Sequence, residues 1–133
     1  MIFIDSGAFL ARYVKRDQHH AEAVSFWNEL ANSGTPCFTS NWILSETLTL
    51  LARRTDYIFA AERARQLYSS HVLQILRPDA SDESAAILLF EKYADQHVSF
   101  CDCVPFMLMR RLGIADAFTL DGHSAIAGFN IRP

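Results

Sequence analysis

The sequence predicts an α/β fold, rich in helix, built on a short central parallel sheet of four to five strands. Short apolar runs typical of buried strands alternate with helical patterns of ten or more residues. Helices of that length allow crossover connections, so neighbouring strands run parallel and helices cover both faces. The chain has 133 residues and 50% hydrophobic content, which suit one domain over residues 1–133.

The first half of the chain contains two strand patterns and four helical ones. Glycine at position 34 favours a helix end before it, because Gly adopts the left-handed conformation that ends many helices. Apolar residues recur at helical spacing in each longer segment. We expect strands at 2–4 and 36–39, and helices at 6–14, 20–32, 41–54 and 57–71.

The second half repeats the alternation. Asp79 to Asp82 offer several capping residues for a helix. Asp102 is predicted to cap the next helix, with Pro105 in its first turn. We expect strands at 72–76 and 117–120 and near Ile131. We also expect a helix that is capped within 79–82 and runs to about 95, a helix from 102 to 113, and a final turn at 124–128.

The overall charge weighs against a broad nucleic-acid-binding face. The net charge is −3 and the isoelectric point is near 5.9. An acidic cluster loaded with divalent cations reverses its local sign, so a nucleic-acid enzyme stays open. The three cysteines, an odd number, favour reduced thiols over a disulfide framework or a metal site. No apolar run is long enough to span a membrane, and no basic leader is present, so we expect a cytoplasmic protein.

Asp5 is the most informative residue. It directly follows the apolar run 2–4 and precedes small residues. Ligands of open α/β sheets bind at the carboxyl edge of the strands, where this acid is expected to lie. Asp121 follows the strand pattern ending at Leu120 in the same way, although an ordinary Asp-Gly turn also explains it. Parallel strands would bring both acids to one edge.

Two further acids are candidates for the same edge. Asp102 begins a helix, where a carboxylate can cap the helix and still offer an oxygen outward. Glu46 borders the core-facing side of its helix, so periodicity alone makes it a solvated surface acid. Its helix follows the strand at 36–39 and so begins at the same sheet edge as Asp5. This favours a position of Glu46 near Asp5.

Carboxylates that converge repel one another unless a cation lies between them. Mg²⁺ and Mn²⁺ prefer oxygen ligands, and Mg²⁺ usually binds one or two carboxylates and keeps several waters. Two such ions can stabilise the attacking and leaving oxygens of a phosphodiester displacement. The four acids Asp5, Glu46, Asp102 and Asp121 therefore suggest metal-assisted phosphodiester chemistry.

Four segments in order resemble the motifs of the PIN-domain nucleases, especially the VapC-type toxins of toxin–antitoxin pairs. The resemblance covers essentially the whole chain, and four motifs in order are fairly specific where each alone is weak. The segments are Ile2-Phe3-Ile4-Asp5-Ser6, Thr39-Ser40-Asn41-Trp42-Ile43-Leu44-Ser45-Glu46-Thr47, Val98-Ser99-Phe100-Cys101-Asp102-Cys103, and Phe118-Thr119-Leu120-Asp121-Gly122-His123 with Ala127-Gly128-Phe129.

The resemblance implies a PIN-like three-layer α/β/α domain and a Mg²⁺- or Mn²⁺-dependent endoribonuclease. Asp5, Glu46 and Asp102 match the family's core acids, and Asp121 matches its more variable fourth acid. The implied partners are an RNA substrate and a cognate antitoxin. An apolar helical surface left exposed would suit a homodimer or the helix of the antitoxin, and we expect a homodimer. No membrane partner is expected.

Several other residues have two readings each. Asp116 either substitutes for Asp121 or simply starts a strand, which is favoured. The resemblance matches Ser6 and Thr119 to polar positions near the metal, although turn and strand roles also fit. His123 either contacts substrate or a metal ligand, or is an exposed or packing histidine, which is favoured. Five basic residues either contact RNA phosphates or lie on solvated helix faces: Arg12, Lys15, Arg16, Arg110 and Arg111.

Two other functions remain open from the sequence. A non-catalytic PIN-like domain would bind RNA or protein without cutting, although the presence of all four acids argues against it. A phosphatase that forms an aspartyl phosphate on Asp5 would normally carry a second Asp two residues later, where this chain has Gly7.

Overall fold

The computed structural model describes residues 1–133 and contains one five-stranded sheet with the order β3-β2-β1-β4-β5. All four neighbouring pairs are parallel. The predicted parallel sheet of four to five strands is therefore confirmed. Its strands are β1 Ile2–Ile4, β2 Cys37–Ser40, β3 Leu73–Leu76, β4 Asp116–Phe118 and β5 Asn130–Arg132.

Seven α-helices connect these strands, close to the predicted ranges. Only α3 has the predicted bounds on both sides, and the other ends shift by a few residues. A short 3₁₀ helix, Ala94–Gln96, follows α5. The helices are α1 Ser6–Tyr13, α2 His20–Ser33, α3 Asn41–Arg54, α4 Tyr57–Tyr68, α5 Ala80–Lys92, α6 Phe100–Leu112 and α7 His123–Ile126.

Capping side chains fix where these helices begin. Ser40 ends β2 and caps α3, since its hydroxyl accepts a hydrogen bond from the Ile43 amide at 3.2 Å. Asp79 and Asp82 form a reciprocal capping box at the start of α5. Gly34 and Gly113 end α2 and α6 in the left-handed conformation, at φ angles of 65° and 69°. The strand-to-helix junction at Ser40 places the first turns of α3 at the carboxyl edge of the sheet.

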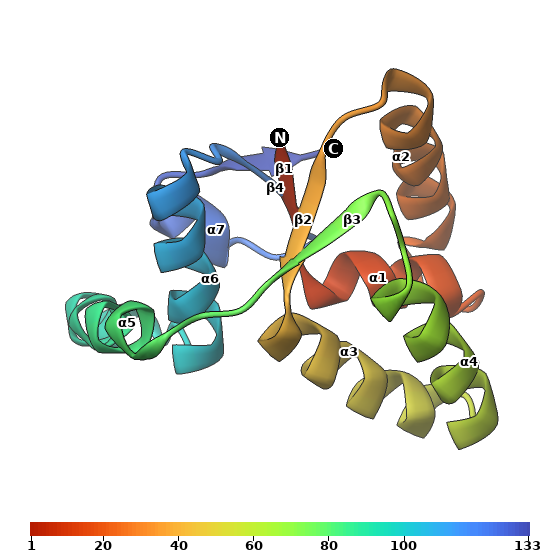
Figure 1. Ribbon diagram of the computed structural model, residues 1–133, viewed down its shortest axis with the longest axis horizontal. Coiled ribbons are helices and arrows are strands. Elements are labelled where there is room, and N and C mark those ends of the chain that lie inside the picture. The colour runs from red at the N-terminus through yellow and green to blue at the C-terminus, as the bar shows by residue number, and fades with distance from the viewer.

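The helices form layers on both sides of the sheet. Figure 1 shows α1 and α2 on one side and α6 and α7 on the other, with α5 outside α6. The main core buries both sides of the central strands, with Phe3, Phe9 and Phe118 each 2% exposed or less. A second core joins α5, α6 and α7 around Val104 and Leu108. The predicted helix-rich α/β architecture is thus confirmed.

Two boundaries near the candidate acids differ from the prediction. Strand β4 spans Asp116–Phe118, so it ends before Thr119 and leaves two residues between the strand and Asp121. Helix α6 begins at Phe100 and is capped by the Ser99 hydroxyl, so the prediction that Asp102 is the capping residue is wrong.

Ser99 takes the capping position because its hydroxyl accepts the Asp102 amide hydrogen bond at 3.1 Å, which leaves the Asp102 carboxylate free. Pro105 consequently lies inside α6 and not in its first turn. The proline ring has no N–H, so the carbonyl of Cys101 loses its usual helical donor. Because Ser99 caps α6, the Asp102 side chain has no capping role.

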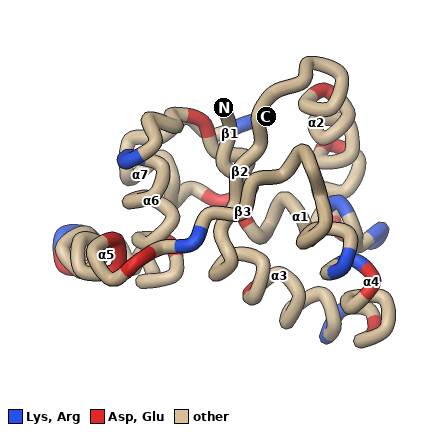
Figure 2. The backbone as a smooth tube through the Cα atoms, in the orientation of Figure 1, with Lys and Arg blue, Asp and Glu red and all other residues tan.

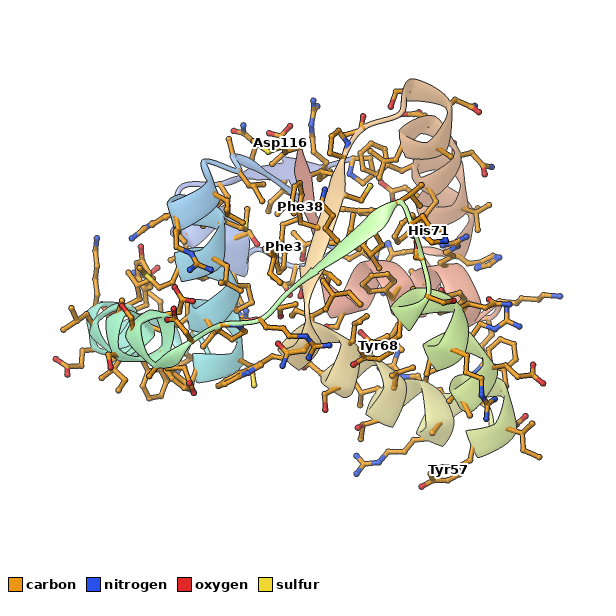
Figure 3. The ribbon with its side chains drawn as sticks, viewed as in Figure 1. Phe3, Phe38, Tyr57, Tyr68, His71 and Asp116 are labelled. Carbon is orange, nitrogen blue, oxygen red and sulfur yellow. The ribbon has the colours of Figure 1, made fainter.

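The β-sheet has two chemically different edges. Asp116 pairs in register with Ile2, at the amino ends of β4 and β1. Figure 3 places Asp116 at the end of the sheet where the chain begins, away from α1 and α3. Asp5 lies beyond the other end of β1. None of the helices is long and apolar enough to cross a lipid bilayer.

Candidate functional site

Asp5 lies at the carboxyl end of the central strand β1, where the chain turns into α1. It caps that helix, because its Oδ1 accepts a hydrogen bond from the Ser6 amide at 2.9 Å. Its Oδ2 accepts a hydrogen bond from the Thr119 hydroxyl at 2.9 Å. Both carboxylate oxygens are thus fixed by groups from two different segments. Asp5 is partly buried and follows the carboxyl end of β1, which is the location expected from the sequence.

Thr119 connects Asp5 to Asp121. The Asp5 amide donates to the carbonyl of Phe118 at 3.0 Å, which aligns the end of β1 with the end of β4. Thr119 follows immediately and is 2% exposed. Its Oγ1 also accepts a hydrogen bond from the Asp121 amide at 3.3 Å. One hydroxyl therefore positions two acids that lie more than a hundred residues apart in the chain.

Asp102 approaches from α6. Its carboxylate Oδ2 accepts a hydrogen bond from His123 Nδ1 at 2.9 Å. The same nitrogen is 3.8 Å from Asp121 Oδ1. The Asp102 side chain is 22% exposed and that of Asp121 is 50% exposed, so both can reach solvent.

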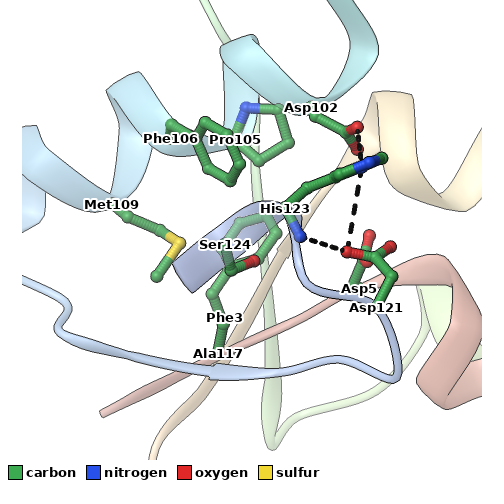
Figure 4. A pocket seen from close by; sticks show the side chains of 10 residues that line it. All are labelled: Phe3, Asp5, Asp102, Pro105, Phe106, Met109, Ala117, Asp121, His123 and Ser124. Atoms are coloured by element: carbon green, nitrogen blue, oxygen red, sulfur yellow. Dashed lines mark hydrogen bonds and ion pairs between the residues drawn. The ribbon is translucent and has the colours of Figure 1, made fainter. Parts of the chain in front are cut away.

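Three of the four predicted acids line one small pocket. Figure 4 shows Asp5, Asp102 and Asp121 at one end of this pocket, with His123 between Asp102 and Asp121. The pocket lies beside β1 and β4, where the strand order changes direction along the chain. Ligands of open parallel sheets bind at such switch points, outside the carboxyl ends of the strands. The location and the acids together make this the candidate active site.

The pocket disfavours the charged form of the Asp5 carboxylate. Burial raises the pKa of Asp5 to about 6, and the negative charges of Asp121 and Asp102 also raise it. The hydrogen bonds from Ser6 and Thr119 lower this pKa but do not offset burial. A cation near Asp5 would stabilise its charged form and lower this pKa.

Glu46 is placed differently from the other three acids. It is exposed on α3 and lines a neighbouring groove with Trp42, Ser45 and Cys101. Burial raises the pKa of the Cys101 thiol, and the negative charges of Glu46 and of the adjacent Asp102 raise it further. Glu46 therefore borders the candidate site across Cys101 but does not line the pocket that holds Asp5.

The donor set fits a hard divalent cation. No three His, Cys, Asp or Glu side chains are positioned to hold one ion together. Mg²⁺ commonly binds proteins through only one or two carboxylates and keeps most of its waters. Carboxylate oxygens are its preferred ligands. Asp5, with Asp102 or Asp121, offers the one or two carboxylates that such an ion could bind.

The remaining acid, Asp116, lies outside the site. Its carboxylate accepts a hydrogen bond from Asn130 Nδ2 at 2.9 Å and lies 3.7 Å from Arg132 Nε. Both partners belong to β5, so Asp116 ties β4 to the edge strand. The favoured interpretation of Asp116 as a residue at the start of a strand agrees with this position, and a role in place of Asp121 does not.

Four of the five basic residues singled out in the sequence have structural contacts, and the fifth, Lys15, is exposed. Arg110 donates to the Tyr93 hydroxyl and to the Ala127 carbonyl, both at 3.3 Å. Arg111 forms an ion pair with Asp82 at 3.3 Å. Arg12 lies over the Trp27 ring at 4.7 Å and Arg16 donates to the Arg54 carbonyl at 2.7 Å. Figure 2 shows basic residues gathered around the distal part of α1 and α4, on the side opposite α5.

His123 contacts an acid of the pocket, and the sequence did not show which acid that would be. It starts α7, and its backbone amide donates to Asp121 Oδ1 at 2.9 Å. This is the turn that Asp commonly makes with the amide two residues later. The Asp-x-His spacing thus signals the turn, but only the packing of α7 against α6 brings the ring to Asp102.

Comparison with known proteins identifies the family. The PIN domain family matches residues 2–128, nearly the whole chain. The chain belongs to the PIN-domain family. This PIN domain is 34% identical, over 134 aligned positions, to the 23S rRNA-specific endonuclease VapC20 of Mycobacterium tuberculosis, strains CDC 1551 / Oshkosh and ATCC 25618 / H37Rv. The alignment covers 100% of this chain and 99% of that protein, so the resemblance to VapC-type proteins is confirmed.

Two solved structures have the same fold as this chain. The crystal structure of M. tuberculosis VapC20, described as a toxin that cleaves the sarcin–ricin loop, superposes with a TM-score of 0.87 at 32% identity. Both chains are covered completely. FitAcB from Neisseria gonorrhoeae has the same fold, with a TM-score of 0.72 at 17% identity over 100% of this chain and 97% of that one.

Proposed function

We propose that this PIN domain is a metal-dependent endoribonuclease that hydrolyses RNA phosphodiester bonds and is the toxin of a toxin–antitoxin pair. The observation that carries the proposal is the pocket where Asp5, Asp102 and Asp121 meet at the carboxyl edge of the sheet. Full-length similarity to a 23S rRNA-specific endonuclease supports it. Residues 1–133 would act as one domain, since a single sheet includes strands from Ile2 to Arg132. The proposed location of this domain is the cytoplasm.

The residues of the pocket can bind a cation and orient it. Mg²⁺ or Mn²⁺, when bound, would stabilise the negative charge that develops on the phosphate and on the leaving oxygen. Thr119 and the Ser6 amide hold both oxygens of Asp5 in place. Asp102 and Asp121 reach solvent on the open side of the pocket, where a phosphodiester can approach. Glu46 lies in the adjoining groove and would contribute from that side.

The substrate proposal is ribosomal RNA. The relative with 34% identity is named for cleavage of 23S rRNA, and its structure is described as that of a toxin cleaving the sarcin–ricin loop. An RNA hairpin with that loop sequence is thus the first substrate to test, beside an unrelated hairpin of equal length.

The decisive experiment measures RNA cleavage by the purified chain with and without Mg²⁺ or Mn²⁺. Asp5→Asn should reduce the cleavage rate by about 10²- to 10³-fold, because it removes a negative charge from the proposed cation site. The matched control is Asp116→Asn, which makes the same chemical change on the other sheet edge and should leave the rate within about threefold. Equal rates for wild type and Asp5→Asn would refute the site.

The proposed antitoxin has a candidate docking groove remote from the acids. A large groove, lined by Phe9, Trp27 and Leu67 among others, runs between α1, α2 and α4. Arg12 and Arg63 line it, and Arg63 Nε is buried without a hydrogen-bond partner. A buried donor without an acceptor is costly, so a partner segment with carbonyl or carboxylate oxygens fits this groove. Arg63→Glu should weaken antitoxin binding in a pull-down while RNA cleavage is unchanged.

The proposed homodimer has a different candidate surface. Ile87, Leu88 and Phe90 on α5 are 48%, 68% and 46% exposed. A helix surface of this kind suits an interface where the same patch meets itself across a two-fold axis. Leu88→Glu should shift the protein from dimer to monomer in light scattering, and a wild-type monomer would refute the dimer.

A non-catalytic PIN-like binding domain is the second candidate. The observation that favours it is that no three metal-binding side chains are positioned to hold one ion together. Binding of RNA without cleavage, at millimolar Mg²⁺ and Mn²⁺, would establish this alternative. The phosphatase alternative lacks the second Asp expected two residues after Asp5, since Gly7 occupies that position.

A further inference from the structure

The three acids of the pocket come from three separate parts of the fold. Asp5 follows β1, Asp121 follows β4, and Asp102 lies in the first turn of α6. The first two are joined directly through Thr119, whose Oγ1 contacts Asp5 Oδ2 at 2.9 Å and the Asp121 amide at 3.3 Å. Asp102 has no such connection through the sheet. Something else must hold its side chain toward the other two acids.

His123 provides that connection. Its Nδ1 lies 2.9 Å from Asp102 Oδ2, and this is the one protein hydrogen bond to the Asp102 carboxylate. Because a carboxylate accepts, the proton lies on Nδ1 and Nε2 is turned away from this bond. Figure 4 shows the ring between Asp102 and Asp121. A free Asp side chain in an exposed first turn would otherwise sample several rotamers.

The backbone that carries His123 is itself fixed. The His123 amide donates to Asp121 Oδ1 at 2.9 Å, and the next residue, Ser124, is 6% exposed. At the other end of α7, the Ala127 carbonyl accepts a hydrogen bond from Arg110 Nη2 at 3.3 Å. Helices α6 and α7 are therefore joined at two points, with the Asp102–His123 bond at the end next to the acids. The imidazole is presented from a rigid position.

We propose that His123 is a positioning residue of this site, which holds the Asp102 carboxylate toward Asp5 and Asp121 and thereby sets the affinity of the pocket for a divalent cation. The inference rests on the proposed metal-dependent function and adds to it a residue outside the acidic set. Hydrogen bonds to ligating carboxylates fix their orientation, and their loss costs about 10- to 100-fold in metal affinity or activity.

Because the His123 side chain is 41% exposed, it can be replaced with little effect on the fold. Removing a partly exposed ring creates little cavity, so fold stability should change little. His123→Ala deletes the donor. His123→Asn keeps an N–H donor at the same distance from the backbone as Nδ1, whereas His123→Gln places its amide one bond farther out. The Ala, Asn and Gln variants thus separate the hydrogen bond from the bulk of the side chain.

The experiment is calorimetric titration of the full chain with Mn²⁺ at fixed pH, which needs no cleavage activity. His123→Ala should weaken Mn²⁺ binding by about 10-fold or more, and His123→Asn should bind within about threefold of wild type. His123→Gln should fall between them. His71→Ala, which alters an exposed histidine far from the acids, should match wild type. Thermal unfolding of each variant checks that the fold is retained.

The outcomes separate this inference from the proposed function. Wild-type binding of Mn²⁺ with an equal affinity in His123→Ala overturns the role of His123 and leaves the function standing. Weak binding by both His123→Ala and His123→Asn also overturns it, because the hydrogen bond would then not be the cause. Failure of the wild type itself to bind Mn²⁺ overturns the metal-dependent function, and the positioning role with it.

Discussion

The two edges of the sheet treat the same chemical group in opposite ways. At the amino edge, Asp116 faces Arg132 at 3.7 Å and accepts a hydrogen bond from Asn130, so its charge is compensated. At the carboxyl edge, Asp5 has only the neutral donors Ser6 and Thr119, and two further acids lie beside it. The pKa of Asp5 is raised to about 6 by burial and by Asp121 and Asp102.

The difference shows how a structural acid can be distinguished from a functional one. A carboxylate that is paired with a cation of the protein stabilises the fold or leaves it unaffected. An acid without such a partner destabilises the fold unless something outside the chain supplies the positive charge. The acids at the carboxyl edge therefore destabilise the fold, and a bound cation would remove this destabilisation.

The largest stability effect should come from Asp5→Asn. Because the pKa of Asp5 is about 6 in the fold and 3.8 without it, the variant should be more stable than wild type by about 1–3 kcal/mol at pH 7. Urea unfolding monitored by circular dichroism gives the difference. Wild type and variant with equal stability at pH 7 would show that Asp5 is not under electrostatic strain.

The stability difference between wild type and Asp5→Asn should depend on pH, because folding raises the pKa of Asp5. The folded state holds the Asp5 proton more tightly than the unfolded state, so between pH 3.8 and about 6 it binds more protons. This contribution to wild-type stability is present below pH 3.8 and is lost as the pH rises through about 6. Asp5→Asn should lack this loss, and the two proteins should converge near pH 3.5.

A smaller effect is expected from the cation itself. At ten times its dissociation constant, Mg²⁺ should stabilise wild type by about 1.4 kcal/mol, because it binds the folded state alone. The shift in melting temperature should vanish in Asp5→Asn and persist in Asp116→Asn. An equal Mg²⁺ shift in all three proteins would place the binding site elsewhere.

The smallest effect belongs to the amino edge. Asp116→Asn removes the attraction to Arg132 but keeps an oxygen for Asn130, and it should cost about 0–1 kcal/mol, as expected for an exposed ion pair. Urea unfolding at low and at high salt measures it. A loss well above that range would mean that the two edges differ less than their contacts indicate.

Much of the fold could be predicted because its signals are local. The apolar run at Ile2–Ile4 and the helical pattern of Asn41–Arg54 have the predicted bounds. The errors lie where one residue can take either of two roles. Ser99 and Asp102 are both good capping residues, and Ser99 takes the position. Thr119 and Leu120 favour strand by composition, but Thr119 instead hydrogen-bonds Asp5.

The site was predictable only in part. Asp5 and Asp121 could be placed because each follows a strand, and parallel strands share their carboxyl edge. Glu46 followed the same logic of position but lies in the next groove, since the direction of its side chain depends on how α3 packs. The four acids as catalytic and metal-binding residues remain a prediction for the variants to test.

The sequence by itself determined the alternation of strands and helices, the parallel sheet and the acids at strand ends, since these depend on residue periodicity and on chain connectivity. The tertiary structure decided which groups meet: the Thr119 hydroxyl with Asp5, the His123 ring with Asp102, and Arg132 with Asp116. Contacts between residues far apart in the chain depend on how helices pack on the sheet, and spacing along the sequence contains no measure of that packing. The same residue type, aspartate, is thus a strand tie on one edge and a candidate metal ligand on the other.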